Sequence, residues 1–377
     1  MNSQSFLPAY LSEITSNLLN SYGDDNFDFT RYVKREKEVK KITPKTMINA
    51  FLRKKKFISL PLFSKLVVDA IEFVVPLLPY LDTVYAQLAD DDSRNILRKV
   101  LSYRALGYQK VKLPLNVPQY WEGIKKVKNL ANSRDKIPFN FVKSEFESEL
   151  PLFDLHSIDF PLQLYSQPAV VYNEFVAGQY ICTSGQTKIG VEQGDIAIDV
   201  GGCWGETALH FAYSAGADGK VFSYEFAREN LEVFNRNLNL NPRFREKIEV
   251  IEYAAWSSSH ITLNFEENGP GTRVIADNSN KAIGAETLSI DDLVESKGIA
   301  RVDFIKMDIE GSELQALQGA INTIKRHRPE LAISIYHKLL DFVEIPEFIN
   351  SLGLGYRLFI RHYTIYGEET VLYAKVI

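Results

Sequence analysis

The chain has 377 residues, and its 45% hydrophobic and 24% charged residues are typical of an ordinary soluble globular protein. This length favours two domains over one. The formal net charge of −5 is unevenly divided, because basic residues outnumber acidic ones in 1–150 while acidic residues outnumber basic ones in 151–377. Since phosphate contacts need a basic surface, the acidic second part argues against a nucleic-acid partner.

The cysteine content and the lack of targeting patterns bear on the location of the protein. Cys182 and Cys203 are the only cysteines, which excludes a disulfide framework and favours a reducing, cytoplasmic compartment. The N-terminus lacks the basic-then-apolar pattern of a signal peptide. The most apolar stretch, 57–81, is broken by charged residues and prolines, so we expect no transmembrane segment. The basic stretches 34–37 and 53–56 are interpreted as solvated helix faces, and the alternative is contact with a membrane or an acidic partner.

Helices are predicted for the first part of the chain. The clearest pattern lies at 90–106, where acidic residues in the first turn precede apolar residues at helical spacing, and Gly107 provides a stop. We therefore expect a mainly helical N-terminal domain over 1–135. Prolines and aromatic residues without long periodic runs follow at 136–190, which predicts a connector that packs on the next domain, 191–377.

From residue 194 onward the predicted strands and helices alternate, which is typical of a parallel sheet covered by helices on both faces. The last two strands, joined through Gly367, imply one antiparallel member. An inserted hairpin is expected at 261–265 and 272–276. The expected strands are 194–200, 221–224, 248–254, 302–308, 331–337, 356–362 and 370–376, and the main helices are 206–213, 228–239, 312–326 and 345–352.

The turn at 199–205 (DVGGCWG), between the first of these strands and a helix, is the most informative stretch of the chain. Its glycines allow the backbone to turn sharply and to approach a ligand closely. The second strand ends on Glu225, and a carboxylate at this place suits the two hydroxyls of a ribose. The pattern therefore indicates a cofactor that contains a nucleoside.

The spacing of the turn favours one such cofactor. Gly201, Gly202 and Gly205 depart from the G-x-G-x-x-G fingerprint that presents a helix N-terminus to a pyrophosphate. Asp199 would repel a pyrophosphate but suits an ammonium group. S-adenosylmethionine has a ribose, a sulfonium and an amino-acid end but no phosphate, so we favour it over a dinucleotide. The remaining alternative is a glycine turn without a ligand.

Polar residues also gather at the expected carboxyl ends of other strands, where open parallel sheets bind their ligands. Asp308, Glu310 and Glu313 surround one strand-to-helix turn, and Lys306 shares a strand face with Asp308. The structural alternative is a Lys306–Asp308 ion pair, with Glu313 supporting the helix N-terminus. The strand-end residues expected at this edge are Asp199, Glu225, Ala254, Asp308, His337 and His362.

Two of the six histidines are candidates for a general base, since histidine is the commonest such group near neutral pH. His337 and His362 both fall at strand ends, and His337 follows the strand next to the one that ends at Asp308. The structural alternative is a hydrogen-bonding role. A divalent metal held by Asp308, Glu310 and a histidine is a further interpretation, but the sequence alone does not place such an ion.

The residues of 194–335 resemble the FkbM-type methyltransferase domain, a class I, S-adenosylmethionine-dependent fold. The resemblance implies a mostly parallel, seven-stranded, Rossmann-like sheet with helices on both faces, here preceded by the mainly helical N-terminal domain. The family usually has Ala-Asn where this chain has Gly202 and Cys203. The segments that carry the resemblance are 194–201 with Gly205, 224–226 with Asn230, 254–257, 287–293, 305–313 and 328–330.

The strand-end positions and the family resemblance together give the expected site residues. Asp199 is expected to orient the methionine end, Glu225 to bind the ribose, and Phe226 and Ala254 to flank the adenine. The expected cofactor-binding residues are Asp199, Gly201, Gly202, Cys203, Gly205, Thr207, Glu225, Phe226, Ala254 and Asp308, and the expected catalytic residues are His337, His362, Asp308, Glu310 and Lys306.

The resemblance implies an O-methyltransferase that acts on a hydroxyl of a sugar, glycan or secondary metabolite. The alternatives are an N-methyltransferase and a non-catalytic binding protein that keeps the cofactor fold. The expected partner is a small-molecule or glycan acceptor, without nucleic acid. We expect the N-terminal domain to shape the acceptor site or to form a homo-oligomer interface.

Overall fold

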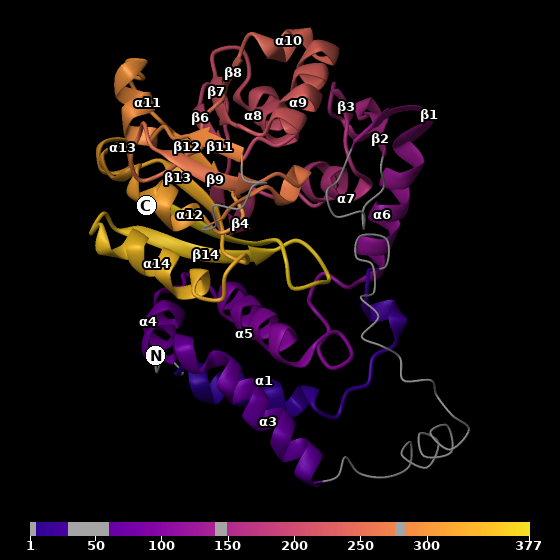
Figure 1. Cartoon of the computed structure of the whole chain (residues 1–377). Coiled ribbons are helices and arrows are strands. Elements are labelled where there is room, and N and C mark those ends of the chain that lie inside the picture. The colour runs from indigo at the N-terminus through magenta and orange to yellow at the C-terminus, as the bar shows by residue number, and fades with distance from the viewer. Residues whose placement is uncertain (1–4, 29–59, 140–148, 276–282) are drawn as a thin grey trace.

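A computed structural model describes residues 5–28, 60–139, 149–275 and 283–377. The basic stretches 34–37 and 53–56 lie outside the described residues. The centre of the fold is a seven-stranded sheet with the strand order β14-β15-β13-β12-β6-β7-β8 (Figure 1). Its strands are β6 (Ile196–Val200), β7 (Lys220–Tyr224), β8 (Ile248–Ile251), β12 (Phe304–Met307), β13 (Glu330–Ser334), β14 (Tyr356–His362) and β15 (Thr370–Val376).

The strand directions confirm the predicted class I methyltransferase fold. Strands β8, β7, β6, β12 and β13 run parallel to one another, whereas β15 runs antiparallel to both of its neighbours. The chain proceeds outward in one direction from β6 to β7 and β8, and in the other direction from β12 to β13. The strand order therefore reverses between β6 and β12, and ligands of open sheets bind beside the carboxyl ends at such a point.

Helices cover both faces of the sheet, as the alternation of strands and helices predicted. Along β6, Ala197 faces one side while Ile198 and Val200 face the other, which is the two-residue period of a strand. One face packs against α8 (Glu206–Ala215) and α9 (Arg228–Leu240). The other packs against α11 (Ile290–Ser296), α12 (Glu313–Gln318), α13 (Ile321–His327) and α14 (Asp341–Ser351).

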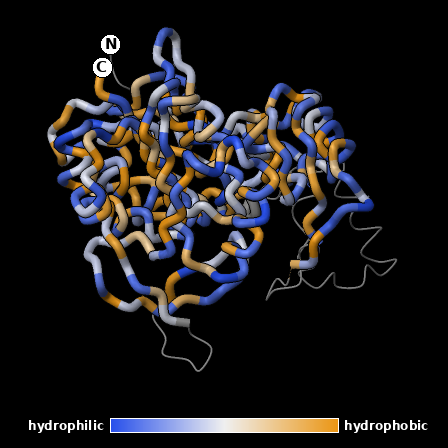
Figure 2. The backbone as a smooth tube through the Cα atoms, turned by 90° about the horizontal axis from the view of Figure 1, so that it is seen from above, coloured by the Kyte–Doolittle hydropathy of each residue, from blue (hydrophilic) through white to orange (hydrophobic). Residues whose placement is uncertain are grey.

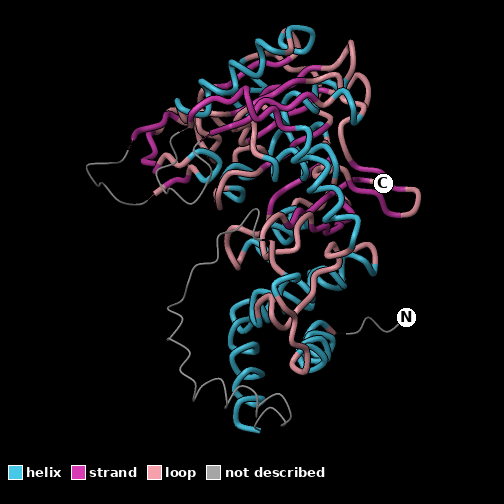
Figure 3. Tube along the Cα trace, turned by 90° about the vertical axis from the view of Figure 1, so that its right-hand side faces the viewer, coloured by secondary structure: helices cyan, strands magenta, loops and turns pink. Residues whose placement is uncertain are grey.

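The helical N-terminal region packs on the outer part of the sheet, below β14 in Figure 1. Asp90 accepts a hydrogen bond from Ser93 N (2.8 Å) at the start of one helix and pairs with Arg361 Nη2 at 2.7 Å. Apolar residues of these helices belong to the same hydrophobic core as one face of the sheet. Figure 3 shows the helices as a layer beneath the sheet. The described helices of this region are α1 (Phe6–Asn17), α3 (Leu60–Val74), α4 (Leu78–Gln87) and α5 (Asp91–Leu106), with the 3-10 helices η1 (Asp24–Asn26) and η2 (Val75–Leu77). The next helix, α6 (Pro118–Leu130), lies apart from them and packs against α7, η4 and β1 (Figure 1).

The segment predicted as a connector carries small elements of its own. Asn237 of α9 accepts a hydrogen bond from Tyr165 N (2.7 Å) and donates one to Tyr165 O (2.9 Å), which fixes β3 on that helix. The domain boundaries at 135 and 190 stay predictions. The elements are β1 (Ala131–Pro138), β2 (Glu149–Asp154), η3 (His156–Ile158), β3 (Gln163–Tyr165), α7 (Pro168–Val171), the π-helix η4 (Tyr172–Val176), β4 (Cys182–Ser184) and β5 (Thr187–Ile189).

Two predicted elements differ from the structure. The helix expected over 312–326 is divided into α12 and α13 at Gly319, where a Cβ atom would lie 2.0 Å from Trp256 O. The inserted hairpin is present but gains a third strand, β11, which pairs with β9. The remaining elements are α10 (Pro242–Arg245), β9 (Thr262–Glu266), η5 (Gly269–Gly271), β10 (Arg273–Val274) and β11 (Ile283–Glu286).

The hydropathy of the chain agrees with this packing. In Figure 2 hydrophobic and hydrophilic residues alternate along the traced elements. No helix within the described residues combines the length and the apolar character needed to cross a bilayer. Cys182 and Cys203 are both free thiols, as expected.

Candidate active site at the carboxyl edge of the sheet

Two cavities open side by side at the carboxyl ends of β6, β7 and β12. The larger one has a volume of about 510 Å³. Their linings share Gly201, Cys203, Pro270, Asp308 and Glu310, so the cavities meet at the turns that follow β6 and β12. This is the point where the strand order reverses, and the strand topology alone indicates a ligand there.

The glycine turn is shaped by close backbone packing. Gly201 has φ +90°, and a Cβ atom there would lie 2.1 Å from Asp308 O. Gly205 has φ +88°, and its Cβ atom would lie 2.4 Å from the ring of Phe234. Larger residues are therefore excluded at both positions by the protein itself. The turn that results exposes Gly201 and Cys203 to both cavities.

Asp199 lies beneath this turn and is fully buried. Its Oδ2 atom accepts hydrogen bonds from Thr207 Oγ1 (2.9 Å) and Ser223 Oγ (2.7 Å), and its Oδ1 atom lies 3.1 Å from Lys306 Nζ. Among the described residues, the cavity linings include Thr207 but not Asp199. The carboxylate is held by Thr207, Ser223 and Lys306 beneath the turn, and its expected role in orienting the methionine end stays a prediction.

Lys306 has a different partner from the one considered in the sequence. It pairs with Asp199 on the neighbouring strand rather than forming the main ion pair with Asp308, and its Nζ atom donates to Gly201 O at 2.7 Å. Burial opposes the charge of Lys306, but the carboxylates of Asp199 and Asp308 outweigh this effect and raise its pKa. Lys306 therefore stays cationic and fastens the glycine turn to β12.

Glu225 lies in the smaller cavity, as predicted. Its Oε1 atom accepts hydrogen bonds from Phe226 N (2.8 Å) and Ala227 N (2.7 Å), and its Oε2 atom accepts one from Asn230 Nδ2 (3.1 Å). Burial raises its pKa to about 7, although these hydrogen bonds act in the opposite direction. Phe226 and Ala254 line the same cavity, so the structure brings the three expected nucleoside contacts together.

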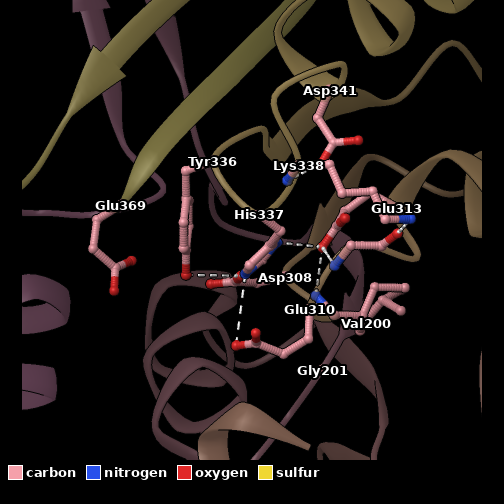
Figure 4. A network of polar contacts seen from close by, with 12 residues as sticks. Val200, Gly201, Asp308, Glu310, Glu313, Tyr336, His337, Lys338, Asp341 and Glu369 are labelled. Carbon is pink, nitrogen blue, oxygen red and sulfur yellow. Dashed lines mark hydrogen bonds and ion pairs between the residues drawn. The ribbon is translucent and has the colours of Figure 1, made fainter. Parts of the chain in front are cut away.

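Asp308 occupies the junction of the two cavities. Its Oδ2 atom accepts a hydrogen bond from Tyr180 Oη at 2.7 Å, and its Oδ1 atom accepts one from Tyr336 Oη at 3.3 Å. His337 Nε2 lies 3.4 Å from the same Oδ1 atom. Figure 4 shows Asp308, Tyr336 and His337 converging on one point from two strand ends.

His337 is surrounded by carboxylates (Figure 4). Its Nε2 atom lies 3.6 Å from Glu310 Oε1, and its Nδ1 atom lies 3.0 Å from Glu313 Oε1. Burial opposes a charge on the ring, but Glu313 and Glu310 outweigh it and hold the pKa of His337 well above its usual value. Glu310 has φ +55°, a left-handed conformation that is uncommon for a residue with a side chain. We name Asp308, Glu310, Glu313 and His337 the junction cluster.

The structure separates the two predicted histidines. His362 ends β14, and β15 lies between β14 and β13 in the sheet. Its Nδ1 atom lies 2.9 Å from Thr370 Oγ1. His362 is absent from the described linings of both cavities, whereas His337 lines the larger one. The structure therefore brings only His337 to the junction, and the roles of both histidines stay predictions.

Several residues of the larger cavity were missed in the sequence. Arg104 of α5 enters the cavity wall, where its Nε atom donates to Gly367 O at 3.2 Å and its Nη2 atom contacts Tyr336 O. No local pattern links these residues, because they come from separate elements that meet only in the folded chain. The missed residues of the wall are Arg104, Gln167, Asn173, Glu174, Gln179, Tyr180, Arg273, Tyr336, Glu368 and Glu369.

Comparisons with known proteins indicate the family that the chain resembles. Residues 189–358 match the model of the methyltransferase FkbM domain, which confirms the resemblance predicted from the sequence. The hexuronic acid methyltransferase AglP of Haloferax volcanii is 29% identical over 137 residues, 36% of this chain and 53% of that protein. The chain thus spans about half the length of this curated relative.

Solved methyltransferase structures are also similar to the chain. The crystal structure of the FkbM methyltransferase from Methylobacillus flagellatus KT has 23% sequence identity and a TM-score of 0.49, and the match covers 82% of this chain and 61% of that one. Fibrillarin from Aeropyrum pernix, solved with bound S-adenosyl-L-methionine, has 13% identity and a TM-score of 0.32, with 64% and 99% covered.

Proposed function

Starting from the FkbM methyltransferase domain in residues 189–358, we propose that this protein transfers the methyl group of S-adenosylmethionine to a hydroxyl of a sugar, glycan or secondary metabolite. The observation that carries the proposal is the junction between the two cavities. Asp308 and Glu310 line both cavities, and His337 lines the larger one beside them. A methyl donor in one cavity and an acceptor in the other would meet beside the carboxylates of Asp308 and Glu310, which can accept the hydroxyl proton.

The smaller cavity suits the nucleoside of the cofactor. Glu225 would accept hydrogen bonds from the ribose hydroxyls, and Phe226 and Ala254 would flank the adenine. The methionine end would then pass Gly201 and Cys203, which line both cavities. Since the buried Asp199–Lys306 pair fixes this turn from below, the cofactor would meet a rigid backbone.

The larger cavity suits an acceptor with many hydroxyls. Its volume of about 510 Å³ lies in the usual range for small-molecule sites. The wall offers carboxylates, amides and guanidinium groups, including Arg104, Asn173, Gln179 and Glu369, which hydrogen-bond well to sugar hydroxyls. The name of the Haloferax volcanii relative, a hexuronic acid methyltransferase, is in line with a sugar acceptor.

The reaction follows from this arrangement. The acceptor oxygen attacks the methyl carbon, the bond from that carbon to sulfur breaks, and S-adenosylhomocysteine leaves. The hydroxyl proton passes to a group of the junction cluster. Holding the donor and the acceptor in line contributes most of the rate enhancement, and a positioned proton acceptor adds about 10²–10⁴-fold.

The test is binding followed by product analysis. Calorimetry of the full chain is expected to show binding of S-adenosylhomocysteine, and a panel of sugars and glycosides should yield a methyl ether on an oxygen, identified by mass spectrometry and NMR. Binding of NAD without binding of the methyl donor would contradict the proposal. A methylated amine as the product would favour the N-methyltransferase, and cofactor binding without turnover would favour a binding protein.

A further inference from the structure

The junction cluster contains more negative groups than a histidine can balance. The His337 ring lies within 3.0 to 3.6 Å of one oxygen each of Glu313, Asp308 and Glu310. Even a protonated imidazole brings one positive charge to these three carboxylates. The Glu313 carboxylate is fully buried, and since a buried carboxylate needs a compensating charge, a further cation at this place would stabilise the cluster.

Two side chains of the cluster are buried with unused ligand atoms. The His337 side chain is 7% exposed, and within the described residues its ring nitrogens contact the cluster carboxylates as ion pairs without a well-directed hydrogen bond. The Glu313 side chain is fully buried, and within the same described part of the chain its Oε2 atom has no hydrogen-bond partner. Leaving such atoms unsatisfied costs free energy, so they point to a ligand between them.

The spacing of the ligand atoms fits a metal ion. One carboxylate oxygen each of Asp308 and Glu313 and one ring nitrogen of His337 lie within 4.8 Å of one another. Atoms that share an ion at about 2.0–2.6 Å must lie roughly 3–5 Å apart. Two carboxylates with one imidazole suit Mg²⁺ or Mn²⁺ better than a thiolate-preferring metal.

We propose that Asp308, Glu313 and His337 bind a divalent cation of the Mg²⁺ or Mn²⁺ type at the junction of the two cavities. The inference rests on the proposed function, because the ion serves the acceptor hydroxyl of the same reaction. Asp308 and His337 line the larger cavity, so coordination positions of the ion open toward the acceptor. Through this opening the ion binds the acceptor hydroxyl, in addition to balancing the charge of the cluster.

The ion changes how the hydroxyl loses its proton. An acceptor hydroxyl bound to the cation becomes more acidic, as water does on a metal ion. Its proton passes to Glu310, whose side chain is 32% exposed and can release it to solvent. The resulting alkoxide stays on the ion, attacks the methyl carbon and displaces S-adenosylhomocysteine. His337 acts as a ligand in this scheme and does not take up the proton.

The experiment compares two histidine variants of the full chain. His337→Gln removes a proposed ligand, and His362→Gln makes the same change at the end of β14, outside the cavity linings that the structure describes. After treatment with a chelator, each protein is titrated with Mn²⁺ while EPR records the free aqua ion. Binding of S-adenosylhomocysteine, measured by calorimetry, verifies that each variant is folded.

One Mn²⁺ per chain is expected for the wild type and for His362→Gln, with affinity at least about 10-fold weaker for His337→Gln. Mn²⁺ should likewise raise the melting temperature of the first two proteins only. Equal Mn²⁺ binding by all three proteins, or none by the wild type, would overturn the metal site. Methyl transfer at full rate in chelator would overturn the ion's role but leave the proposed function intact. Mn²⁺ binding without cofactor binding or turnover would support the metal site but contradict the proposed function.

Discussion

The two cavities differ in how the chain builds them. The smaller one is lined by residues of 200–312, all within the methyltransferase FkbM domain. The larger one also takes residues that precede or follow that domain, such as Arg104, Glu174, Tyr180 and Glu369. With the roles proposed above, the cofactor would meet only residues that match the family model. The acceptor would also meet the N-terminal helices and the loop between β14 and β15.

The largest expected effect lies at the junction of the two cavities. His337→Ala should lower turnover by about 10²–10⁴-fold, whether the ring accepts the proton or holds a metal ion. Affinity for S-adenosylhomocysteine should stay nearly unchanged, because His337 lines only the larger cavity. Steady-state kinetics with calorimetry measure both quantities. If His362→Ala lowers turnover by as much as His337→Ala, the distinction between the two strand ends is wrong.

The next largest effect concerns the smaller cavity. Glu225→Ala should weaken binding of S-adenosylhomocysteine by about 1–3 kcal/mol, the scale of hydrogen bonds to a charged group. The matched control is Glu232→Ala on α9, the helix that follows Glu225, where the side chain is 65% exposed. Calorimetry compares the two variants with the wild type. Equal affinity for the three proteins would show that the ribose does not meet Glu225.

These two cavities also show what the sequence could predict. Glu225 was identified because it ends a strand, a position fixed by local pattern. The hydrogen bonds that Asp199 accepts from Thr207 and Ser223 could not be predicted, because a sequence does not show which side chains meet inside the fold. The helix predicted over 312–326 is divided at Gly319, which packs so closely against Trp256 O that a side chain would not fit, and a local pattern does not show this contact.

The wall of the larger cavity lay beyond sequence prediction for a related reason. Arg104 and Gly367 meet only because α5 packs on β14, and neither residue belongs to a recognisable motif. Both histidines were predicted to end strands. The structure confirms this for His362, which ends β14, whereas β13 ends at Ser334, before His337. Their separation depends on the strand order, since β15 inserts between β13 and β14. A linear pattern of strands does not determine that order.

A smaller effect is expected where the N-terminal region meets the larger cavity. Arg104→Met should raise the KM for the acceptor by about 10-fold, because a charged hydrogen-bond donor contributes roughly 1.5–3 kcal/mol and part of it holds Gly367 rather than the acceptor. Affinity for S-adenosylhomocysteine should stay within twofold, since Arg104 lines only the larger cavity. Kinetics over a range of acceptor concentrations measure the first quantity. Weaker cofactor binding with an unchanged acceptor KM would contradict the division between the cavities.

The smallest effect is a pH dependence of the cofactor side. Burial raises the pKa of Glu225 to about 7, so the carboxylate is the main form at pH 8 and the neutral acid is the main form at pH 6. Charge-assisted hydrogen bonds to the ribose need the carboxylate, so affinity for S-adenosylhomocysteine should fall as the pH drops through 7. The expected loss between pH 8 and pH 6 is roughly fivefold to tenfold, because about one tenth of the groups stay ionised one unit below the pKa. Glu225→Gln should bind weakly at both values and remove most of this dependence. If its affinity changes with pH as much as that of the wild type, another group titrates, and Glu225 would not be what makes the smaller cavity sensitive to pH.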